Sequence, residues 1–185
     1  MLRNTVAALA VLAATPALAT GIEITVAGEA NGVIAIDLLE DIVPGHVARI
    51  TSLATSGQYD GVAFHRVIEG FMAQTGDVQF GDTTDNYDAG SAGRGGSDQG
   101  DLQAEFSDTP YVRGVVGMAR SQSPNSANSQ FFITFGDAAF LNGQYTVVGT
   151  VTSGLDVLDA IKRGHPRSGA ITGAPDVMSK VVVTD

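Results

Sequence analysis

Arg66 and Gln74 carry polar side chains whose types could form hydrogen bonds with a substrate. They lie in the stretch FHRVIEGFMAQTGD, residues 64–77, which mixes polar and apolar side chains in a way that a plain core strand would not need. The guanidinium of Arg66 is permanently charged and presents a rigid fork of N–H groups, so it offers hydrogen-bond donation to a substrate. A second stretch, GVVGMARSQSPNSANSQFFITF at residues 114–135, mixes the two kinds of residue in the same way around Gln130.

Other kinds of active site find no support in the sequence. The G-x-S-x-G pattern of serine hydrolases is absent, and so are the glycine-rich patterns that bind phosphate. Asp82, Asp85 and Asp88 do not have the spacing of a calcium-binding EF-hand loop. We therefore expect no metal, nucleotide or other cofactor.

The three histidines show no metal-binding arrangement either. His65 stands beside Arg66, but no second histidine or acid follows at metal-ligand spacing. We expect His65 to be structural and hydrogen-bonded under the candidate site. We expect His46 and His165 to be solvated.

A third stretch, FLNGQYTVVGTV at residues 140–151, completes a set of positions that match a known family. Together the three stretches closely resemble the signatures of the cyclophilin-type peptidyl-prolyl cis-trans isomerases, above all in the pattern F-H-R-x-I-x-x-F-M-x-Q-x-G-D. The resemblance runs from about Ile22 to the C-terminus and points to the exported branch of the bacterial members. It implies an enzyme that rotates X-Pro peptide bonds.

The resemblance also implies roles for individual residues. Arg66 matches the catalytic arginine, and Gln74 matches the glutamine that orients it and touches the substrate backbone. Gln130 matches a second glutamine that contacts substrate, and Ala119 matches a position whose backbone pairs with it. The remaining matches to substrate-binding positions are Phe71, Met72, Phe132 and Leu141 in the pocket wall, with Arg120, Phe140 and Tyr145.

Prolyl isomerisation breaks no covalent bond, so its catalysis needs no base, nucleophile or metal. The enzyme must twist the C–N bond against a barrier of about 18–20 kcal/mol. Twisting gives the nitrogen a lone pair, and a donor aimed at that lone pair binds the twisted amide more tightly than the planar one. The resemblance makes Arg66 that donor, in a pocket that excludes water.

Three positions depart from the pattern of many family members. Phe140 stands where many eukaryotic members have Trp, Tyr145 where many have His, and Arg120 where many have Asn. Phe140 lacks the indole N–H that such a Trp offers to the drug cyclosporin, so we expect drug affinity to suffer. The residues matched to isomerase activity are complete.

Residues 1–19 predict a cleaved signal peptide. Arg3 precedes a short apolar run at residues 5–15, and Ala-Leu-Ala at 17–19 gives a cleavage signature. The alternatives are a membrane anchor or a buried helix, but spanning a bilayer takes roughly 20 apolar residues. The chain has no cysteine for lipid attachment. We expect a periplasmic or secreted protein without stable membrane association, whose residues 20–185 form one isomerase domain.

The charge balance is acidic, with 10 Lys and Arg against 20 Asp and Glu. Such a surface repels phosphate backbones and anionic lipid heads. We therefore expect no nucleic-acid partner and assign the charge to solubility. We also expect a monomer.

Short apolar runs separated by Gly, Asn and Asp indicate a mainly β protein. Residues 43–56 predict a helix with Pro44 in its first turn, and residues 153–163 predict another with Ser153 as N-cap. Residues 81–103, rich in Gly, Asp and Ser, predict a surface loop. The expected strands are residues 22–27, 33–39, 62–68, 114–119, 130–134, 145–151 and 180–184.

These elements agree with the fold that the resemblance implies, a closed eight-stranded antiparallel β-barrel capped by two α-helices. The expected function is a peptidyl-prolyl cis-trans isomerase that assists the folding of exported proteins. Its partners would be unfolded or extended chains that contain proline. The alternative is a catalytically weak module that binds such chains as a chaperone, and the presence of Arg66 and Gln74 favours the enzyme.

Overall fold

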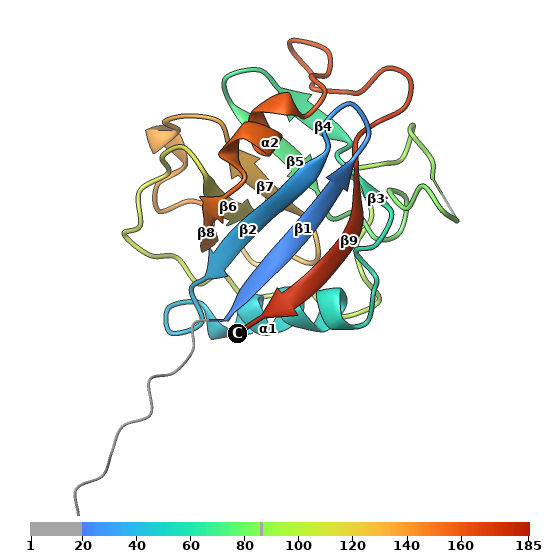
Figure 1. The fold of residues 1–185 in the computed structure, drawn as a ribbon. Coiled ribbons are helices and arrows are strands. Elements are labelled where there is room, and N and C mark those ends of the chain that lie inside the picture. Colours follow the sequence, from blue (N-terminus) through green and yellow to red (C-terminus); the bar gives the residue numbers. More distant parts are fainter. Residues whose placement is uncertain (1–19, 86) are drawn as a thin grey trace, which may run out of the picture.

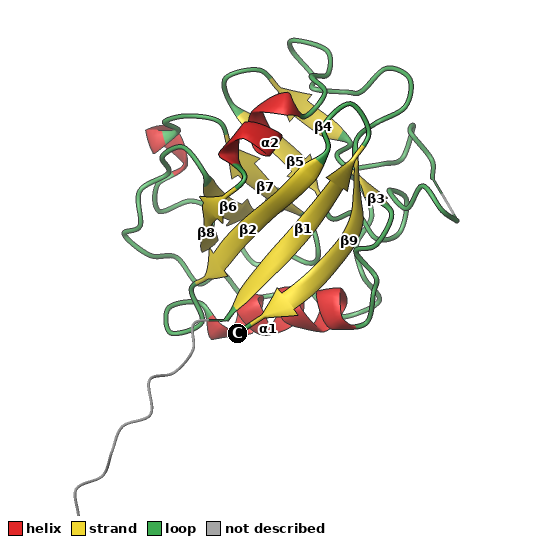
Figure 2. Ribbon diagram, viewed as in Figure 1, coloured by secondary structure: helices red, strands yellow, loops and turns green. Residues whose placement is uncertain are grey.

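A computed structural model describes residues 20–85 and 87–185 of the protein (Figure 1). The expected signal peptide, residues 1–19, lies outside the described residues. The described strands form one sheet with antiparallel neighbours, in the order β3-β9-β1-β2-β8-β6-β7-β5-β4. Helices α1 and α2 lie at opposite ends of the curled sheet (Figure 2). The elements are β1 (Gly21–Ala27), β2 (Gly32–Leu38), α1 (Pro44–Thr55), β3 (Val62–Ala63), β4 (Arg66–Ile68), β5 (Met72–Thr75), β6 (Val115–Met118), β7 (Phe131–Thr134), the 3-10 helix η1 (Ala139–Leu141), β8 (Val147–Ser153), α2 (Leu155–Ala160) and β9 (Val177–Thr184).

The mainly β fold with two helices is confirmed, but the closed eight-stranded barrel is wrong. The sheet has nine strands and curls as a half-barrel. The expected strand at 62–68 breaks at Phe64 and His65 into β3, which pairs with β9, and β4, which pairs with β5. The two halves of one segment therefore occupy opposite ends of the strand order. Strand β5 was not expected as a strand, although Met72 was expected in the pocket wall and Gln74 beside Arg66.

Alternation along the strands builds the core. In β1, Ile22, Ile24 and Val26 are buried, whereas Glu23 and Thr25 are exposed. Such residues fill the larger apolar cluster inside the curl. A smaller cluster lies under β5, β6 and β7; it contains Met72, Tyr111, Val115, Phe132, Ala138, Leu141 and Val147.

The adjacent residues Phe131 and Phe132 divide between the two clusters. Phe131 belongs to the larger cluster and packs edge-on against Tyr59, with ring centroids 5.7 Å apart. Phe132 belongs to the smaller cluster and stacks on Tyr111 at 5.8 Å. Successive side chains of a strand point to opposite faces, so the two adjacent rings pack into different clusters.

Helix α1 begins at Pro44, as expected, and buries one face against the core. Its first turn also buries His46, which has no exposed surface. The expectation that His46 is solvated is therefore wrong. His46 is buried because Glu105, which is 59 residues away in the chain, lies over the start of the helix and supplies a polar partner.

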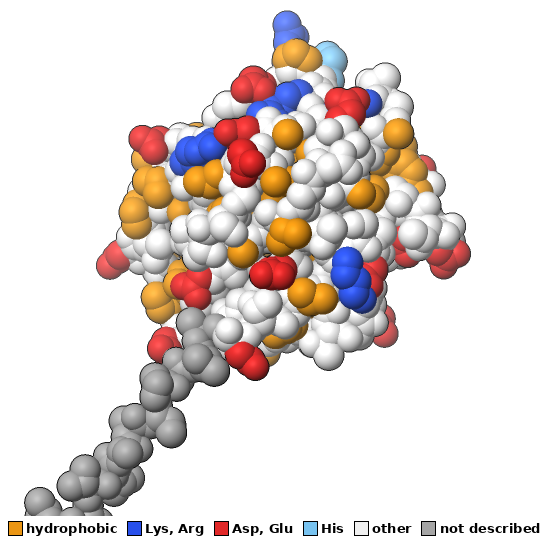
Figure 3. Space-filling model, in the orientation of Figure 1, with side chains coloured by type: hydrophobic (Ala, Val, Ile, Leu, Met, Phe, Trp, Pro, Cys, Tyr) orange, Lys and Arg blue, Asp and Glu red, His pale blue; other side chains and the backbone are white. Residues whose placement is uncertain are grey.

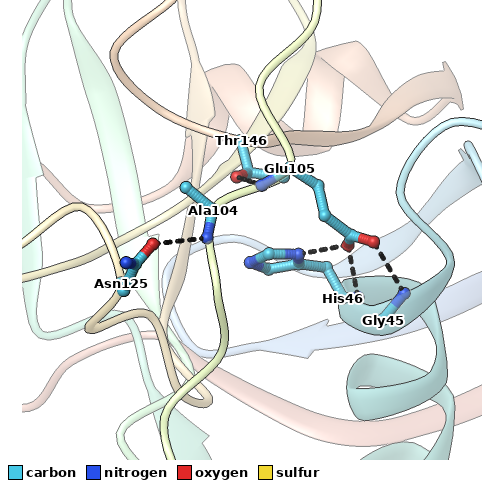
Figure 4. Close-up of polar contacts among 6 residues, drawn as sticks. All are labelled: Gly45, His46, Ala104, Glu105, Asn125 and Thr146. Atoms are coloured by element: carbon cyan, nitrogen blue, oxygen red, sulfur yellow. Dashed lines mark hydrogen bonds and ion pairs between the residues drawn. The ribbon is translucent and has the colours of Figure 1, made fainter.

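The Glu105 side chain lies against Gly45 and His46 at the start of α1 (Figure 4). Its carboxylate accepts hydrogen bonds from the backbone N–H of Gly45 at 3.2 Å and of His46 at 3.0 Å, and His46 Nδ1 lies 2.6 Å from Oε2. Burial raises the pKa of the Glu105 carboxyl, but these hydrogen bonds outweigh burial, and the pKa lies below its ordinary value. The N–H of Glu105 in turn donates to Thr146 Oγ1 at 3.1 Å.

Helix α2 is shorter than expected. Ser153 is the last residue of β8, and the N-cap is Gly154, whose φ of 85° lies in the left-handed region. The N-cap role of Ser153 is therefore wrong. Lys162 and Arg163 lie beyond the helix end, where Lys162 pairs with Glu29 at 2.9 Å and Arg163 stacks over the Phe135 ring at 4.1 Å.

The described part of residues 81–103 contains no helix or strand, as expected for a surface loop. Asp82 and Leu102 form isolated bridges to Val62 and Ala127. Among residues 20–85 and 87–185, no helix is long and apolar enough to cross a membrane.

We predict that Glu105→Gln lowers the stability of the protein by about 1–2 kcal/mol at neutral pH, because hydrogen bonds to a charged acceptor are stronger than neutral ones. The folded-state pKa of Glu105 is lowered, so its stabilisation is present above its ordinary pKa of 4.5 and is lost as pH falls through the folded value. Melting curves from pH 8 down to about pH 3 should therefore converge for wild type and variant at the acid end.

The control is Glu23→Gln, which removes the same charge from the exposed face of β1. It should shift the melting temperature little at any pH. A Glu105→Gln curve that runs parallel to wild type across the whole pH range would contradict the assignment.

Candidate active site

A hollow of about 340 Å³ opens over the smaller apolar cluster; it is here called the proline hollow, after the ligand that the resemblance implies. Strands β4, β5 and β7, the end of β6 and the segment around η1 contribute its walls. It gathers all of the expected site residues except Gln130, and it adds Gln144. Its lining residues are Arg66, Phe71, Met72, Gln74, Ala119, Arg120, Phe132, Phe140, Leu141, Gln144 and Tyr145.

Gln130 lines an adjoining hollow of about 350 Å³, here called the side hollow. The two hollows share three lining residues, so they lie next to each other. The side hollow is lined by Gln74, Gly93, Arg94, Gly95, Ala119, Arg120, Ser121, Ser126, Asn128 and Gln130.

Arg66 is partly buried at the edge of the proline hollow and is held from two sides. Its Nη1 donates to Gln74 Oε1 at 3.1 Å, and its Nε donates to the Ser168 carbonyl at 3.2 Å. Arg66 and Gln74 are direct partners in the β4–β5 register, so their side chains leave the same face of the sheet. Burial lowers the pKa of the Arg66 guanidinium, because water is excluded from part of its surface.

The hydrogen bonds continue from Gln74 away from Arg66. Gln74 Nε2 donates to Gln130 Oε1 at 2.9 Å, and Gln130 Nε2 donates to the Gly95 carbonyl at 2.8 Å. Each amide thus uses its oxygen on one side and its nitrogen on the other. This relay fixes the orientation of Gln74 toward Arg66.

The floor of the proline hollow is apolar. Met72, Phe132 and Leu141 are buried, at 1%, 5% and 6% exposure, and present a closed apolar surface to the opening. Phe140 stands at the rim with 64% of its surface exposed, and its ring lies 5.4 Å from that of Phe71. A small apolar ring fits such a floor, while a polar group attached to it would reach the donors at the edge.

Tyr145 and Arg120 close another side of the proline hollow. The Tyr145 ring packs edge-on against Phe132, with centroids 5.9 Å apart, and the Arg120 guanidinium lies 4.4 Å from the centre of the Tyr145 ring. The face of an aromatic ring attracts a cation. The guanidinium is therefore placed over the hollow without a carboxylate partner among the described residues.

His65 lies behind the site and is buried. The expected hydrogen bonding is loose: the Ala63 backbone and the Gln130 side chain lie near the ring and partly offset the lowering of its pKa by burial, but neither ring nitrogen has a partner of strict geometry in the described structure. Burial lowers the pKa of His65, and the nearby Asp77 carboxylate opposes the change only in part. The ring therefore stays neutral at pH 7, as a structural side chain requires.

Asp77 holds the loop that closes the back of the site. Its buried carboxylate accepts four backbone N–H groups: Oδ1 from Gln79 and Phe80, and Oδ2 from Gly93 at 2.7 Å and Gly95 at 3.0 Å. Gly93 has a φ of 94°, and a Cβ there would lie 3.1 Å from the His65 ring. The loop can approach His65 this closely only with glycine at that position.

Sequence reasoning missed the residues that act through their backbone. Ser168 and Gly95 offer carbonyl oxygens to Arg66 and Gln130, and Gln144 offers one to Arg120. Every residue carries such a carbonyl, so no residue type marks these positions in a sequence. His165, expected to be solvated, is exposed.

In the described part of the chain, no group of three or more His, Cys, Asp or Glu side chains could hold a metal ion. The polar side chains that line the proline hollow are the guanidiniums of Arg66 and Arg120, the amides of Gln74 and Gln144, and the phenol of Tyr145. The arrangement can therefore bind an apolar ring and donate hydrogen bonds beside it.

Comparison with known proteins assigns the family. The family model described as "Cyclophilin type peptidyl-prolyl cis-trans isomerase/CLD" matches residues 22–183, and the chain belongs to this family. A "Probable peptidyl-prolyl cis-trans isomerase" of Brucella suis is 57% identical over 153 residues, which cover 83% of this chain and 78% of the relative. The family and the names of the relatives support peptidyl-prolyl cis-trans isomerase activity for this chain.

Solved structures agree with the fold. A cyclophilin from Hirschia baltica is 26% identical with a TM-score of 0.70, covering 88% of this chain and 73% of that one. A cyclophilin-type isomerase of Cryptosporidium parvum, solved in the presence of the dipeptide Ala-Pro, is 25% identical with a TM-score of 0.73, covering 89% of this chain and 99% of that one.

We predict that Asp77→Asn destabilises the protein by about 3 kcal/mol, because an amide NH₂ would face two backbone N–H donors that lose their acceptor. It should also lower isomerase activity, since the Gly95 carbonyl that orients Gln130 would lose its support. Thermal unfolding and a proline-peptide exchange assay well below the melting temperature measure the two effects.

Asp82→Asn is the matched control in the same loop, because the hydrogen bonds that Asp82 accepts from Thr84 are exposed. It should cost less than about 1 kcal/mol and leave turnover unchanged. If Asp77→Asn behaves like this control, Asp77 does not hold the loop.

Proposed function

We propose that this protein accelerates rotation about X-Pro bonds in exported polypeptides, with Arg66 as the donor to the twisted amide nitrogen. The observation that carries the proposal is the position of Arg66, whose guanidinium is held by Gln74 and Ser168 at the edge of an apolar hollow. The ring of a substrate proline would occupy the floor formed by Met72 and Phe132.

The hydrogen bonds of Arg66 within the protein leave one nitrogen of its guanidinium available to donate to the substrate. Nε and Nη1 have protein partners, whereas Nη2 has none in the described structure. The two N–H groups of Nη2 can therefore turn to a nitrogen that gains a lone pair. A charge-assisted hydrogen bond contributes about 1.5–3 kcal/mol, which corresponds to roughly 10- to 100-fold in rate.

The substrate backbone would be positioned by the groups beside this donor. Ala119 donates its N–H to the Gln130 carbonyl at 2.9 Å, so its own carbonyl is the backbone group left to pair with a substrate. Gln74 and Gln130 are fixed by the relay and need not reorganise during the reaction. Preorganised donors of this kind favour the transition state without a cost at the moment of reaction.

The partners proposed are unfolded or extended chains that contain proline. The Cryptosporidium parvum relative, solved in the presence of Ala-Pro, supports this choice of ligand. The alternative function, a catalytically weak chaperone that only holds such chains, would show binding without turnover. We propose that the protein acts as a monomer and needs no cofactor.

The proposed location is the periplasm or the extracellular medium. The support is the sequence of residues 1–19, with its short apolar run and its Ala-Leu-Ala ending, and the absence of cysteine for lipid attachment. Residues 20–185 would then be the mature isomerase domain. Cell fractionation with mass analysis of the N-terminus tests this, and a full-length protein retained in the cytoplasm would refute it.

We predict that Arg66→Ala lowers the turnover of a proline peptide by about 10- to 100-fold while peptide affinity changes far less. Arg66→Lys should recover little of the loss, because one ammonium cannot reproduce the planar fork. Exchange NMR on a short X-Pro peptide measures turnover, and chemical-shift titration measures affinity.

Arg113→Ala is the control, because Arg113 pairs with Asp159 and lines neither hollow. It removes an equally well-bonded guanidinium and should leave turnover unchanged. Wild-type turnover in Arg66→Ala would remove Arg66 from the mechanism. Peptide binding without turnover in the wild-type protein would favour the chaperone.

A further inference from the structure

The depression around the candidate active site has a charge opposite to that of the whole chain. The chain carries 20 Asp and Glu against 10 Lys and Arg, and acidic side chains are scattered over the face drawn in Figure 3. The proline hollow, the side hollow and a third hollow of about 290 Å³ beside His65 are lined by Arg66, Arg94 and Arg120, with no carboxylate. Isomerisation of a neutral proline does not account for three arginines here.

Arg120 places a fixed positive charge between the proline hollow and the side hollow. Its Nε and Nη2 donate to the Gln144 carbonyl at 3.1 and 2.9 Å, and its Nη1 donates to the carbonyls of Ser121 and Gln122. Carbonyl partners orient a guanidinium but do not neutralise its charge. Its position is therefore set before any ligand arrives.

Arg94 supplies a second positive charge, which is free to move to a ligand. Its side chain is exposed and makes no hydrogen bond or ion pair among those found in the described structure. The backbone beneath it is held, because Asp77 accepts the N–H groups of Gly93 and Gly95 on either side. Asp88 lies near enough to feel the charge of Arg94, but Asp88 is exposed and does not line the side hollow.

The side hollow is the next place that a bound chain can reach from the proline hollow. The two hollows share Gln74, Ala119 and Arg120, and Ala119 is the position expected to pair with the substrate backbone. A chain with proline in the first hollow can thus direct the side chain of a nearby residue into the second. With a volume of about 350 Å³, the second hollow has room for such a side chain.

We propose that the side hollow selects substrates with an acidic side chain near the proline, which pairs with Arg94 and Arg120. This inference rests on the proposed isomerase function and deepens it. Arg94 provides the planar fork that binds a carboxylate with two hydrogen bonds, and Arg120 adds attraction from the other wall. The acidic remainder of the surface repels such a chain elsewhere and favours its approach to this depression.

The test uses pairs of short proline peptides that differ only by Glu or Gln at one position, placed one, two or three residues before the proline or one residue after it. Exchange NMR gives kcat/KM, and chemical-shift titration gives affinity. We expect wild type to favour Glu at one of these positions about three- to fivefold at low salt, the range for a partly exposed ion pair. The preference should disappear at about 1 M salt, where charges are screened within a few ångströms.

Arg94→Gln should lower the Glu-to-Gln ratio, and the double variant with Arg120→Gln should bring it close to one. Arg94→Gln is the cleaner variant, because its side chain is exposed and supports no neighbouring segment. Lys180→Gln is the matched control: it removes one positive charge from β9 and lines none of the three hollows. It should leave the ratio unchanged.

Two results would overturn the proposal. One is equal kcat/KM for the Glu and Gln peptides with wild type at low salt, and the other is a preference for Glu that persists in the double variant. Binding and turnover together separate its failure from that of the proposed function. Tighter binding of the Glu peptide without any turnover would support the proposed selectivity of the side hollow and refute the isomerase function. Turnover without preference refutes the side hollow and keeps the isomerase, and peptides that neither bind nor react overturn both.

Discussion

The buried carboxylate of Asp77 is the interaction on which the geometry of the site depends. A carboxylate without exposed surface is costly unless hydrogen bonds replace its water, and four backbone N–H groups do so here. Two come from the residues just after Asp77 and two from Gly93 and Gly95, so the carboxylate ties both ends of a long loop together. The described part of that loop contains no helix or strand, yet its end is fixed beside the candidate active site.

The direction of the hydrogen-bond relay follows from this fixed end. The Gly95 carbonyl can only accept, so Gln130 must turn its nitrogen toward it and its oxygen toward Gln74. Gln74 must then donate to Gln130 and accept from Arg66, which is the arrangement found. Strand pairing brings these residues into reach, because Gln74 stands opposite Arg66 on one side and Phe132 on the other. A backbone constraint thus decides the orientation of a charged side chain three residues away along the relay.

Much of the fold and of the candidate site could be predicted from the sequence, and each failure has a physical reason. The apolar run at residues 22–27 and the position of Pro44 located β1 and α1 correctly, because each signal is local in the sequence. Strand β5 was not predicted. All but one of its residues are buried, so buried and exposed residues do not alternate along it. His46 was misjudged because its burial depends on Glu105, a partner distant in sequence. Ser153 resembles an N-cap locally, but pairing with Ala35 keeps it in β8.

The side chains around the candidate site also share a constant protonation state near neutral pH. Burial lowers the pKa of Arg66, but from a starting value so high that the guanidinium stays charged. Burial likewise lowers the pKa of His65, which keeps that ring neutral behind the site. The glutamines of the relay do not titrate at all. Because proline rotation transfers no proton, a site built to present one unchanging donor suits it better than one poised between two charge states.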